Sequence, residues 1–359
     1  MGWGRHAKQW SARRAARRFR AVERVLGAQV PRLLEAGGAP GVSVAVSVGG
    51  VRVCRAYGWA NVAAQRPMTV GSVFRVCSIS KPMSAFGVMG LHRAGVLDLD
   101  EPVARYLRSW SLGNVPNVEG VTLRRILSHT AGLGVHHYGT PLAAGPAPST
   151  AGVLSGVCGG TQVGLVAEPG AGVLYSGGGY TLAQMVVEDV TGKAFETYMR
   201  EAVFEPLGMV DTGYGRTCAG LATGHDRAGR AVLASFLPAA SSGLCSTPAD
   251  LVRFWDALVP GPSGEPAGRG LILPEDAELM RQAQAQARAQ EPDGPVWGMG
   301  FCIGSNRLGE TYQHAGWADG WWAFAMGVAD RGVSLAVVIN SDTGREWGRE
   351  VVRRVVKVL

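Results

Sequence analysis

The sequence predicts an α+β fold of two lobes, in which one antiparallel β-sheet flanked by helices is built from both ends of the chain, with a mostly helical lobe inserted. Three observations lead to this prediction. Strand-like runs rich in valine and aromatic residues lie near both ends of the 359-residue chain, helix-like segments fill the middle, and the two kinds do not alternate as in a doubly wound sheet. We therefore expect one domain over residues 25–359, with a sheet lobe at about 25–75 and 295–359 and a helical lobe at about 76–294.

The first elements are predicted from turn and helix-stop signals. A helix over about residues 15–35 is expected to end at the glycine pair 37–38, where left-handed backbone is easily adopted. The apolar runs 41–48 and 51–57 are joined by the glycine pair 49–50, which is typical of a two-residue hairpin turn. This end of the chain is thus expected to contribute a helix and a hairpin.

Helices are predicted through the middle of the chain, and strands return near its end. Residues 134–172 are dense in glycine, alanine and proline without periodicity, which predicts a long loop of the kind that is more often functional than idle. The predicted helices cover residues 78–94, 123–127, 180–190, 194–204, 248–258 and 274–289. The late strands are predicted at 312–316, 321–328 and 333–339, followed by a terminal helix with an apolar stripe from Trp347 to Leu359.

The net charge of +7 is located at one end of the chain. Residues 1–24 hold eight basic side chains and one acidic side chain, so the rest of the chain is balanced and no nucleic-acid partner is expected. This segment has a twin arginine but no apolar run of signal-peptide length, which predicts a solvated, partly helical basic extension. Aliphatic runs such as 335–339 are too short to cross a bilayer, so we expect no membrane span and a cytoplasmic location.

The cysteine and histidine patterns do not predict a metal or a cofactor. No Cys-x-x-Cys spacing occurs, so neither a zinc site nor a disulfide framework is indicated, and buried reduced thiols are the simplest interpretation. The pair His136-His137 lacks a carboxylate at ligand spacing and is interpreted as part of a solvated loop. The six cysteines are Cys54, Cys77, Cys158, Cys218, Cys245 and Cys302.

The candidate chemistry lies in the tetrapeptide Ser78-Ile-Ser-Lys81 at the start of a predicted helix. Residues three apart lie one helical turn apart on the same face, and an amine in a partly desolvated pocket can take the proton of a serine hydroxyl. With only four lysines among the 359 residues, this spacing arises by chance in roughly one sequence in four of this composition, so its surroundings must decide. No Gly-x-Ser-x-Gly occurs, which argues against an α/β-hydrolase nucleophile.

Those surroundings resemble the class C β-lactamase-related serine hydrolases, which include class C β-lactamases, DD-peptidases, D-aminopeptidases, family VIII esterases and some acyltransferases. Ser78-Ile-Ser-Lys81 resembles the family's Ser-x-x-Lys motif, Tyr175-Ser-Gly177 lies where the family has Tyr-x-Asn, and His314-Ala-Gly316 lies where it has Lys-Thr-Gly or His-x-Gly. The resemblance covers about residues 38–345 and implies a β-lactamase/transpeptidase-like fold. Further landmarks in the same order are residues 127–133, 205–209, 242–247 and 340–341.

The resemblance also implies a role for each site residue. Ser78 would attack an acyl carbonyl, Lys81 would hold or take the proton, and Tyr175 would pass it to the leaving group, roles that suit the chemistry of these side chains. The backbone N–H groups of Ser78 and Trp317 would form the oxyanion hole. His314 would line the site and orient the substrate or the Tyr175 hydroxyl.

Two positions depart from the family pattern. Gly177 removes the side-chain amide that grips a lactam or amide carbonyl, and His314 replaces a lysine with a side chain that is usually neutral at pH 7. Both changes resemble esterase and acyltransferase members more than true lactamases.

Trp317, Trp321 and Trp322 follow His314 and have two open interpretations: walls for a bulky or flat acyl group that also exclude water, or filling of the sheet's core.

The expected function is therefore a serine acyl-transfer enzyme that works through an acyl-Ser78 intermediate and hydrolyses esters or amides of a small molecule. One alternative is a transacylase that passes the acyl group to a small amine or alcohol. A second alternative is a β-lactamase or a DD-peptidase of the penicillin-binding type.

Overall fold

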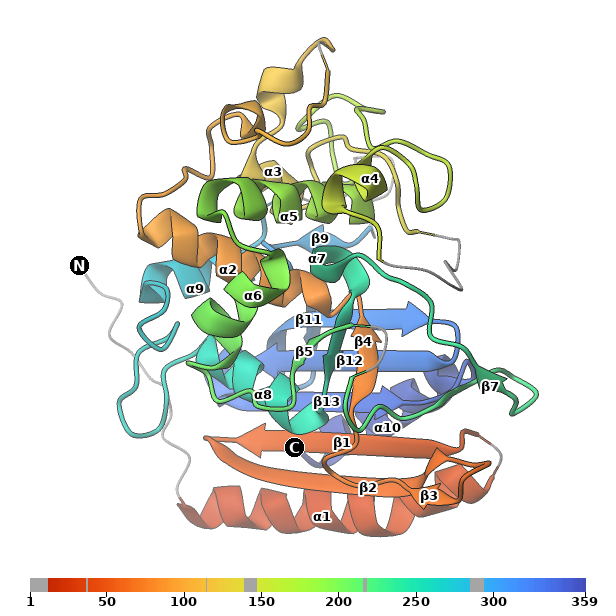
Figure 1. Cartoon of the computed structure of the whole chain (residues 1–359). Coiled ribbons are helices and arrows are strands. Elements are labelled where there is room, and N and C mark those ends of the chain that lie inside the picture. Colours follow the sequence, from red (N-terminus) through yellow and green to blue (C-terminus); the bar gives the residue numbers. More distant parts are fainter. Residues whose placement is uncertain (1–11, 37, 114, 139–146, 216–217, 285–293) are drawn as a thin grey trace.

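The main feature of the fold is an eight-stranded antiparallel sheet with strand order β3-β2-β1-β13-β12-β11-β10-β9 (Figure 1). The computed structural model describes residues 12–36, 38–113, 115–138, 147–215, 218–284 and 294–359. Strands from the two ends of the chain meet where β1 pairs with β13, which confirms the predicted α+β fold. The strands are β1 Gly41–Val48, β2 Val51–Asn61, β3 Arg66–Pro67, β9 Val296–Trp297, β10 Cys302–Asn306, β11 Gly309–Ala318, β12 Trp321–Val328 and β13 Val333–Ile339.

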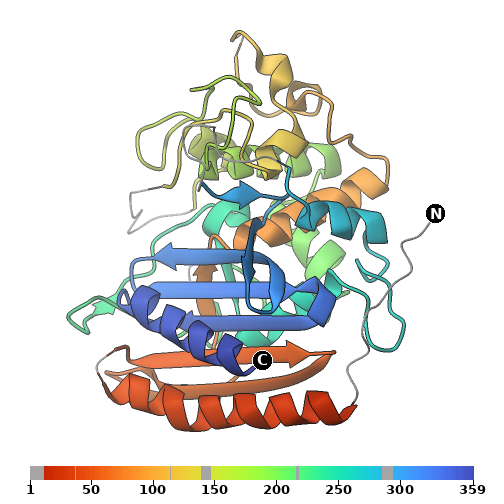
Figure 2. The same cartoon turned by 180° about the vertical axis from the view of Figure 1, so that it is seen from behind.

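Helices cover both faces of the sheet and form the lobe above it in Figure 1. Figure 2 shows α10 and α1 on one face, and α8 packs on the other. The described helices are α1 Ala12–Glu35, α2 Ser80–Arg93, α3 Leu123–Leu127, α4 Thr150–Leu154, α5 Gly177–Thr191, α6 Phe195–Met199, α7 Ala239–Ser242, α8 Pro248–Ala257, α9 Pro274–Arg281 and α10 Gly344–Val358, with a π-helical turn at Arg200–Phe204.

The central strands are buried on both faces, so they are rich in aliphatic residues on both sides. In β1 every residue is buried, with Val44 and Val46 in the core formed with α1 and α10 and Ala45 in the core formed with the helical lobe. Val22 of α1 is also fully buried in the first of these cores. Residues 12–24 of the basic segment thus belong to a helix that packs under the sheet, while the division of the chain at residue 24 stays a prediction.

A second, three-stranded sheet of order β4-β8-β5 supports the helical lobe and was not predicted. Its strands are two to four residues long, too short for alternation to be recognised in the sequence. They are β4 Phe74–Cys77, β5 Gly213–Tyr214 and β8 Leu244–Ser246, and a small hairpin joins β6 Gly224–His225 to β7 Ala231–Val232.

Two sequence predictions are corrected by the structure. The helix predicted over 274–289 ends at Arg281, because the chain beyond it turns and the Gln284 N–H donates to the Trp297 carbonyl (2.6 Å); residues 285–289 lie outside the described chain. The predicted loop 134–172 contains the helix α4, whose first turn is capped by the Ser149 hydroxyl accepting from the Gly152 N–H (3.2 Å). Residues 139–146 of that loop are also outside the described part.

All six cysteines are free thiols. Cys77, Cys158 and Cys245 are buried, whereas the other three are partly exposed, so the expectation of burial holds for half of them. In the part of the chain that the structure describes, no helix combines the length and the apolar character needed to cross a membrane.

One pair of helical glycines tests the packing of α10 against the sheet. An added Cβ at Gly348 would overlap the Trp322 ring, whereas one at Gly27 in α1 would meet nothing within 4 Å. We expect Gly348→Ala to lower the free energy of unfolding by about 1–3 kcal/mol through overpacking, and Gly27→Ala to raise it by up to about 1 kcal/mol through helix propensity. Urea unfolding of both variants measures this, and a stabilised Gly348→Ala protein would contradict the packing described here.

Candidate active site

A strained turn between β4 and α2 presents Ser78. Cys77, at the end of β4, has φ +51°, a left-handed conformation that is costly for a residue with a side chain and is often found at functional sites. The turn is fixed by Ser80, whose hydroxyl donates to the Cys77 carbonyl (2.7 Å) and accepts from the Leu244 N–H of β8 (3.0 Å). Ser78 is partly exposed and lies just before α2. The Ser80 hydroxyl ties the start of this helix to β4 and to β8.

Lys81 lies in the first turn of α2 and is directed at Ser78. Its Nζ is 3.3 Å from the Ser78 hydroxyl oxygen and donates to the Ser241 carbonyl at 2.8 Å. The side chain is only 1% exposed, and this burial lowers the pKa of Lys81 to about 7 because a charged ammonium is poorly stabilised away from water. The sequence motif thus yields an amine that is partly neutral at physiological pH and in contact with a hydroxyl.

Tyr175 comes from the segment before α5 and lies over the same amine. Lys81 Nζ is 4.8 Å from the centre of the Tyr175 ring. Burial raises the pKa of Tyr175 above its usual value, and a side-chain hydrogen bond with Ser78 offsets part of this rise. The ring packs against His129 and Trp297, with centroids 4.2 and 5.4 Å away. The phenol is therefore held neutral beside Ser78.

The strand β11 closes the site from the side of the large sheet. An added Cβ at Gly316 would overlap the carbonyl oxygen of Val76 and lie 3.2 Å from Cys77 Cβ, so only glycine lets β11 approach the strand that carries Ser78. The pairing of β10 with β11 ends at Cys302 and Gln313, and in the part of the chain that the structure describes the rest of β11 has no strand partner on that side. The backbone of Trp317 follows Gly316 directly, and the Trp317 side chain is 58% exposed.

His314 contributes a neutral imidazole whose tautomer is fixed. Its Nδ1–H donates to the Ala315 carbonyl (2.7 Å), since a carbonyl oxygen can only accept, and Nε2 is left as an acceptor. Burial and the nearby charge of Lys81 lower the pKa of His314 to about 3. Its ring centroid lies 6.2 Å from that of Tyr175.

Three buried nitrogens around Tyr175 have no hydrogen-bond partner among the described residues. His129 accepts the Ser176 N–H at Nδ1 (3.1 Å), so its Nε2 carries a proton. The three atoms are thus two donors, His129 Nε2 and Trp297 Nε1, and one acceptor, His314 Nε2. Because orphaned polar groups are rare in folded proteins, this corner of the site is suited to polar atoms of a ligand or to water.

Gly177, where the resembled family has asparagine, is covered by the segment that follows α3. Its N–H donates to the His136 carbonyl (3.0 Å), and an added Cβ would lie 3.0 Å from the same oxygen. A larger side chain at this position would have to displace that segment.

His136 and His137 are exposed, as expected for a loop, and the described residues contain no group of three or more side chains able to hold a metal.

The structure brings most of the predicted site residues together and decides between the two interpretations left open for two of the tryptophans after His314. Ser78, Lys81, Tyr175, His314 and Gly316 converge at one place. Trp321 and Trp322, by contrast, are 2% and 4% exposed and lie in the two hydrophobic cores, so for them the wall interpretation is wrong.

Two residues at the site were not assigned by sequence reasoning. His129 lies within the landmark 127–133, which is the signal that could have found it. Trp297 lies in a two-residue strand after a polar segment, and nothing in the sequence marks it.

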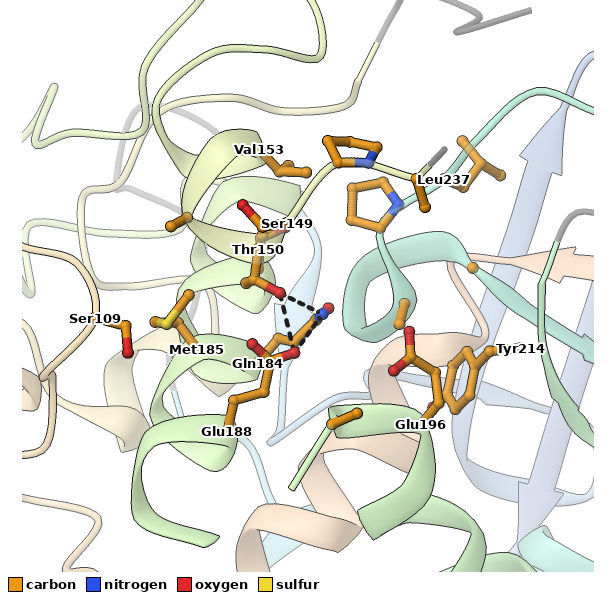
Figure 3. Close-up of a pocket in the computed structure, with 18 of the residues that line it drawn as sticks. Ser109, Ser149, Thr150, Val153, Gln184, Met185, Glu188, Glu196, Tyr214 and Leu237 are labelled. Atoms are coloured by element: carbon orange, nitrogen blue, oxygen red, sulfur yellow. Dashed lines mark hydrogen bonds between the residues drawn. The ribbon is translucent and has the colours of Figure 1, made fainter. Parts of the chain in front are cut away.

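A cavity of about 780 Å³ lies between α4, α5 and the chain before α7, and none of the converging residues lines it (Figure 3). Figure 3 shows Gln184 hydrogen-bonded to Thr150 (2.9 Å) and Glu188 (3.0 Å) on its wall. The Gln184 carbonyl oxygen also accepts from the Ala240 N–H (3.0 Å), and the next residue, Ser241, supplies the acceptor of Lys81. Helix α7 therefore contacts both the cavity wall, through the Ala240 N–H, and the buried Lys81 amine, through the Ser241 carbonyl.

Comparison with known proteins gives a consistent result. The Beta-lactamase family model matches residues 20–357. Esterase EstB of Burkholderia gladioli is 28% identical over 351 residues, which is 85% of this chain and 86% of the esterase. The solved structure of SurE superposes with a TM-score of 0.79 at 27% identity, over 95% of this chain and 77% of SurE. D-amino acid amidase from Ochrobactrum anthropi SV3, solved with L-phenylalanine amide, gives a TM-score of 0.75 at 26% identity, over 95% and 98%.

The glycine at 316 provides a test of the close approach between β11 and β4. We expect Gly316→Ala to slow the reaction of Ser78 with an activated ester by on the order of 10²-fold, the loss typical of one displaced oxyanion-hole donor. Gly164→Ala is the matched control, because a Cβ there meets nothing within 4 Å. Stopped-flow acylation with circular dichroism on both variants makes the measurement. A folded Gly316→Ala protein reacting at the wild-type rate would contradict this geometry.

Proposed function

Because this chain belongs to the Beta-lactamase family of serine hydrolases, we propose that it hydrolyses esters or amides of a small molecule through an acyl-Ser78 intermediate. The observation that carries the proposal is the buried Lys81 amine, whose Nζ lies 3.3 Å from the Ser78 hydroxyl oxygen. The names of two relatives, an esterase and a D-amino acid amidase, support ester or amide substrates for this chain as well.

Acylation begins with removal of the serine proton. The neutral Lys81 amine takes the proton of the Ser78 hydroxyl while the oxygen forms a bond to the substrate carbonyl carbon, and the carbonyl oxygen becomes an oxyanion. The N–H groups of Ser78 and Trp317 stabilise that charge. Tyr175 is not the initial base, since burial raises its pKa and keeps it a phenol at neutral pH.

The tetrahedral intermediate then releases the leaving group. Tyr175 donates its phenolic proton to the leaving oxygen or nitrogen as that bond to carbon breaks, and the Lys81 ammonium returns a proton to the Tyr175 oxygen. In deacylation, a water molecule gives its proton to the Lys81 amine through Tyr175 and attacks the acyl carbon. The bond between the acyl carbon and the Ser78 oxygen then breaks and the carboxylic acid leaves. The Lys81 ammonium returns its proton to the Ser78 oxygen.

His314 acts on the substrate as a neutral acceptor. With Nδ1–H donated to the Ala315 carbonyl, its Nε2 accepts a hydrogen bond from a substrate N–H or O–H or from the Tyr175 hydroxyl. A pKa lowered to about 3 means that it does not attract a substrate carboxylate at neutral pH. This favours substrates recognised by neutral polar groups.

The two alternatives have less support. A transacylase needs water kept from the acyl enzyme, and Trp321 and Trp322, two of the three tryptophans considered for that role, lie in the cores. A β-lactamase or DD-peptidase of the usual kind relies on an amide side chain where this protein has Gly177, covered by the His136 carbonyl. Hydrolysis of uncharged esters or amides therefore remains the favoured activity.

Covalent labelling tests the nucleophile. A fluorophosphonate probe is expected to modify Ser78 alone, detected by peptide mass spectrometry, and Ser78→Ala is expected to remove the label completely. Ser305→Ala, at an exposed serine of β10, serves as the matched control and should label like the wild type. Undiminished labelling of Ser78→Ala would show that the nucleophile lies elsewhere.

The pH dependence of acylation tests Lys81 as the base. Below its pKa of about 7 the amine is protonated and cannot accept the serine proton, so the rate should fall about tenfold per pH unit below 7 and level off above it. Lys81→Arg should abolish acylation, because a guanidinium stays protonated in proteins. Lys193→Arg, at an exposed lysine paired with Glu201, should leave the profile unchanged. A flat profile between pH 5 and 8 would exclude Lys81 as the base.

A further inference from the structure

Arg75 is a buried cation that forms no ion pair with any carboxylate of the described residues. It lies on β4, three residues before Ser78, and is 1% exposed. Its Nε and Nη1 have no hydrogen-bond partner among the described residues, and its guanidinium lies 5.6 Å from the centre of the Trp321 ring. Since a buried unpaired charge is strongly destabilising, an anion nearby would have a clear physical role.

Two thiols lie beside this guanidinium. The antiparallel pairing of β4 with β8 places Cys245 directly opposite Arg75, so the two side chains are on the same face. The Cys245 sulfur is 3.6 Å and the Cys218 sulfur 3.8 Å from the same Gly215 carbonyl oxygen. The two thiols thus meet at one backbone carbonyl, close enough for each to affect the pKa of the other.

Cys218 is distinguished from the other five cysteines by its electrostatics. The hydrogen bond from Cys245 and the charge of Arg75 lower its pKa, against the effect of burial. Burial raises the pKa of Cys54, Cys77, Cys158 and Cys302, and Cys245 is raised as the donor to Cys218. Cys218 is also partly exposed. A partly exposed cysteine of lowered pKa beside a second thiol is the arrangement found at redox-sensitive sites.

We propose that Cys218 and Cys245 are a site of reversible oxidation, at which hydrogen peroxide converts the two thiols into a disulfide beside the strand that carries the nucleophile. The Cys218 thiolate attacks one peroxide oxygen, the O–O bond breaks, and the departing hydroxide takes a proton to become water. The Cys245 sulfur then attacks the Cys218 sulfenic acid, an S–S bond forms as the S–O bond breaks, and a second water leaves. Peroxide accepts the two electrons that the thiols lose.

The disulfide is expected to act on Ser78 through β8. Leu244, next to Cys245, donates its N–H to the Ser80 hydroxyl at 3.0 Å, and Ser80 fixes the Cys77 carbonyl in the strained turn. Oxidation also replaces the two thiols beside Arg75 with a disulfide, which cannot carry a negative charge. Both changes disturb the turn that presents Ser78, so acylation should slow. This consequence rests on the proposed function, whereas formation of the disulfide does not.

The experiment uses the full chain, reduced and desalted, then treated with a slight excess of hydrogen peroxide and alkylated before digestion. Mass spectrometry should find one cross-linked peptide pair, Cys218 with Cys245, that dithiothreitol releases. Cys218→Ser and Cys245→Ser should each lack the cross-link. Cys302→Ser, at a partly exposed thiol on β10, is the matched control and should retain it. A Cys77–Cys245 cross-link, or sulfinic acid at Cys218 without any cross-link, would overturn the assignment.

The effect on the site is read from fluorophosphonate labelling before and after peroxide. Labelling of the wild type should slow about fivefold, the size of a typical coupling between contacting groups, and recover with dithiothreitol, while that of Cys245→Ser should not respond. Unchanged labelling of cross-linked protein would overturn the coupling. If the reduced wild type is not labelled at all, the proposed function fails while the cross-link still tests the thiol pair.

Discussion

Exclusion of water from the Lys81 amine is the constraint on which the rest of the site depends. An exposed lysine is protonated at neutral pH and cannot take a proton from serine. Here three elements enclose it: its own helix α2, the Ser241 carbonyl of α7 at 2.8 Å, and the rings of Tyr175 and Tyr180, 4.8 and 5.6 Å from Nζ. Among the described residues, one carbonyl and one hydroxyl replace the lost water, so the neutral amine becomes accessible near pH 7.

The same burial also determines the protonation state of the neighbouring histidines and of Tyr175. Burial that lowers the pKa of Lys81 also lowers those of His314 and His129 and raises that of Tyr175, because each loses solvation of its charged form. The imidazoles and the phenol are thereby neutral over the range in which the amine titrates. One group, Lys81, therefore governs the charge of this cluster near neutral pH, and the other three act by donating and accepting hydrogen bonds.

How far the sequence could predict this site depended on whether the relevant contact is local. Ser78 and Lys81 share a helical turn, and Pro82 marks its start, so spacing alone placed them together. Tyr175 and His314 come from distant segments, and only the order of family landmarks indicated them. Trp297 was missed because its place is set by backbone hydrogen bonds after α9, beyond any local pattern. The sequence left open whether Trp321 and Trp322 line the site or fill the core, because β12 is buried on both faces and alternation does not reveal which face meets a site.

Arg75 and Lys81 show how two cations in one short stretch can serve different ends. Both side chains are 1% exposed, and they flank the strained turn that carries Ser78. Burial lowers the pKa of a lysine, so the amine can lose its proton and act as a base. A guanidinium keeps its charge in proteins, so that charge must be compensated by the surrounding groups. The charge of Arg75 contributes to lowering the pKa of the nearby Cys218, which favours the thiolate, the form of cysteine that oxidants attack. The electrostatic demand of Arg75 thus gives a physical reason for a reactive thiol to lie next to the nucleophile's strand.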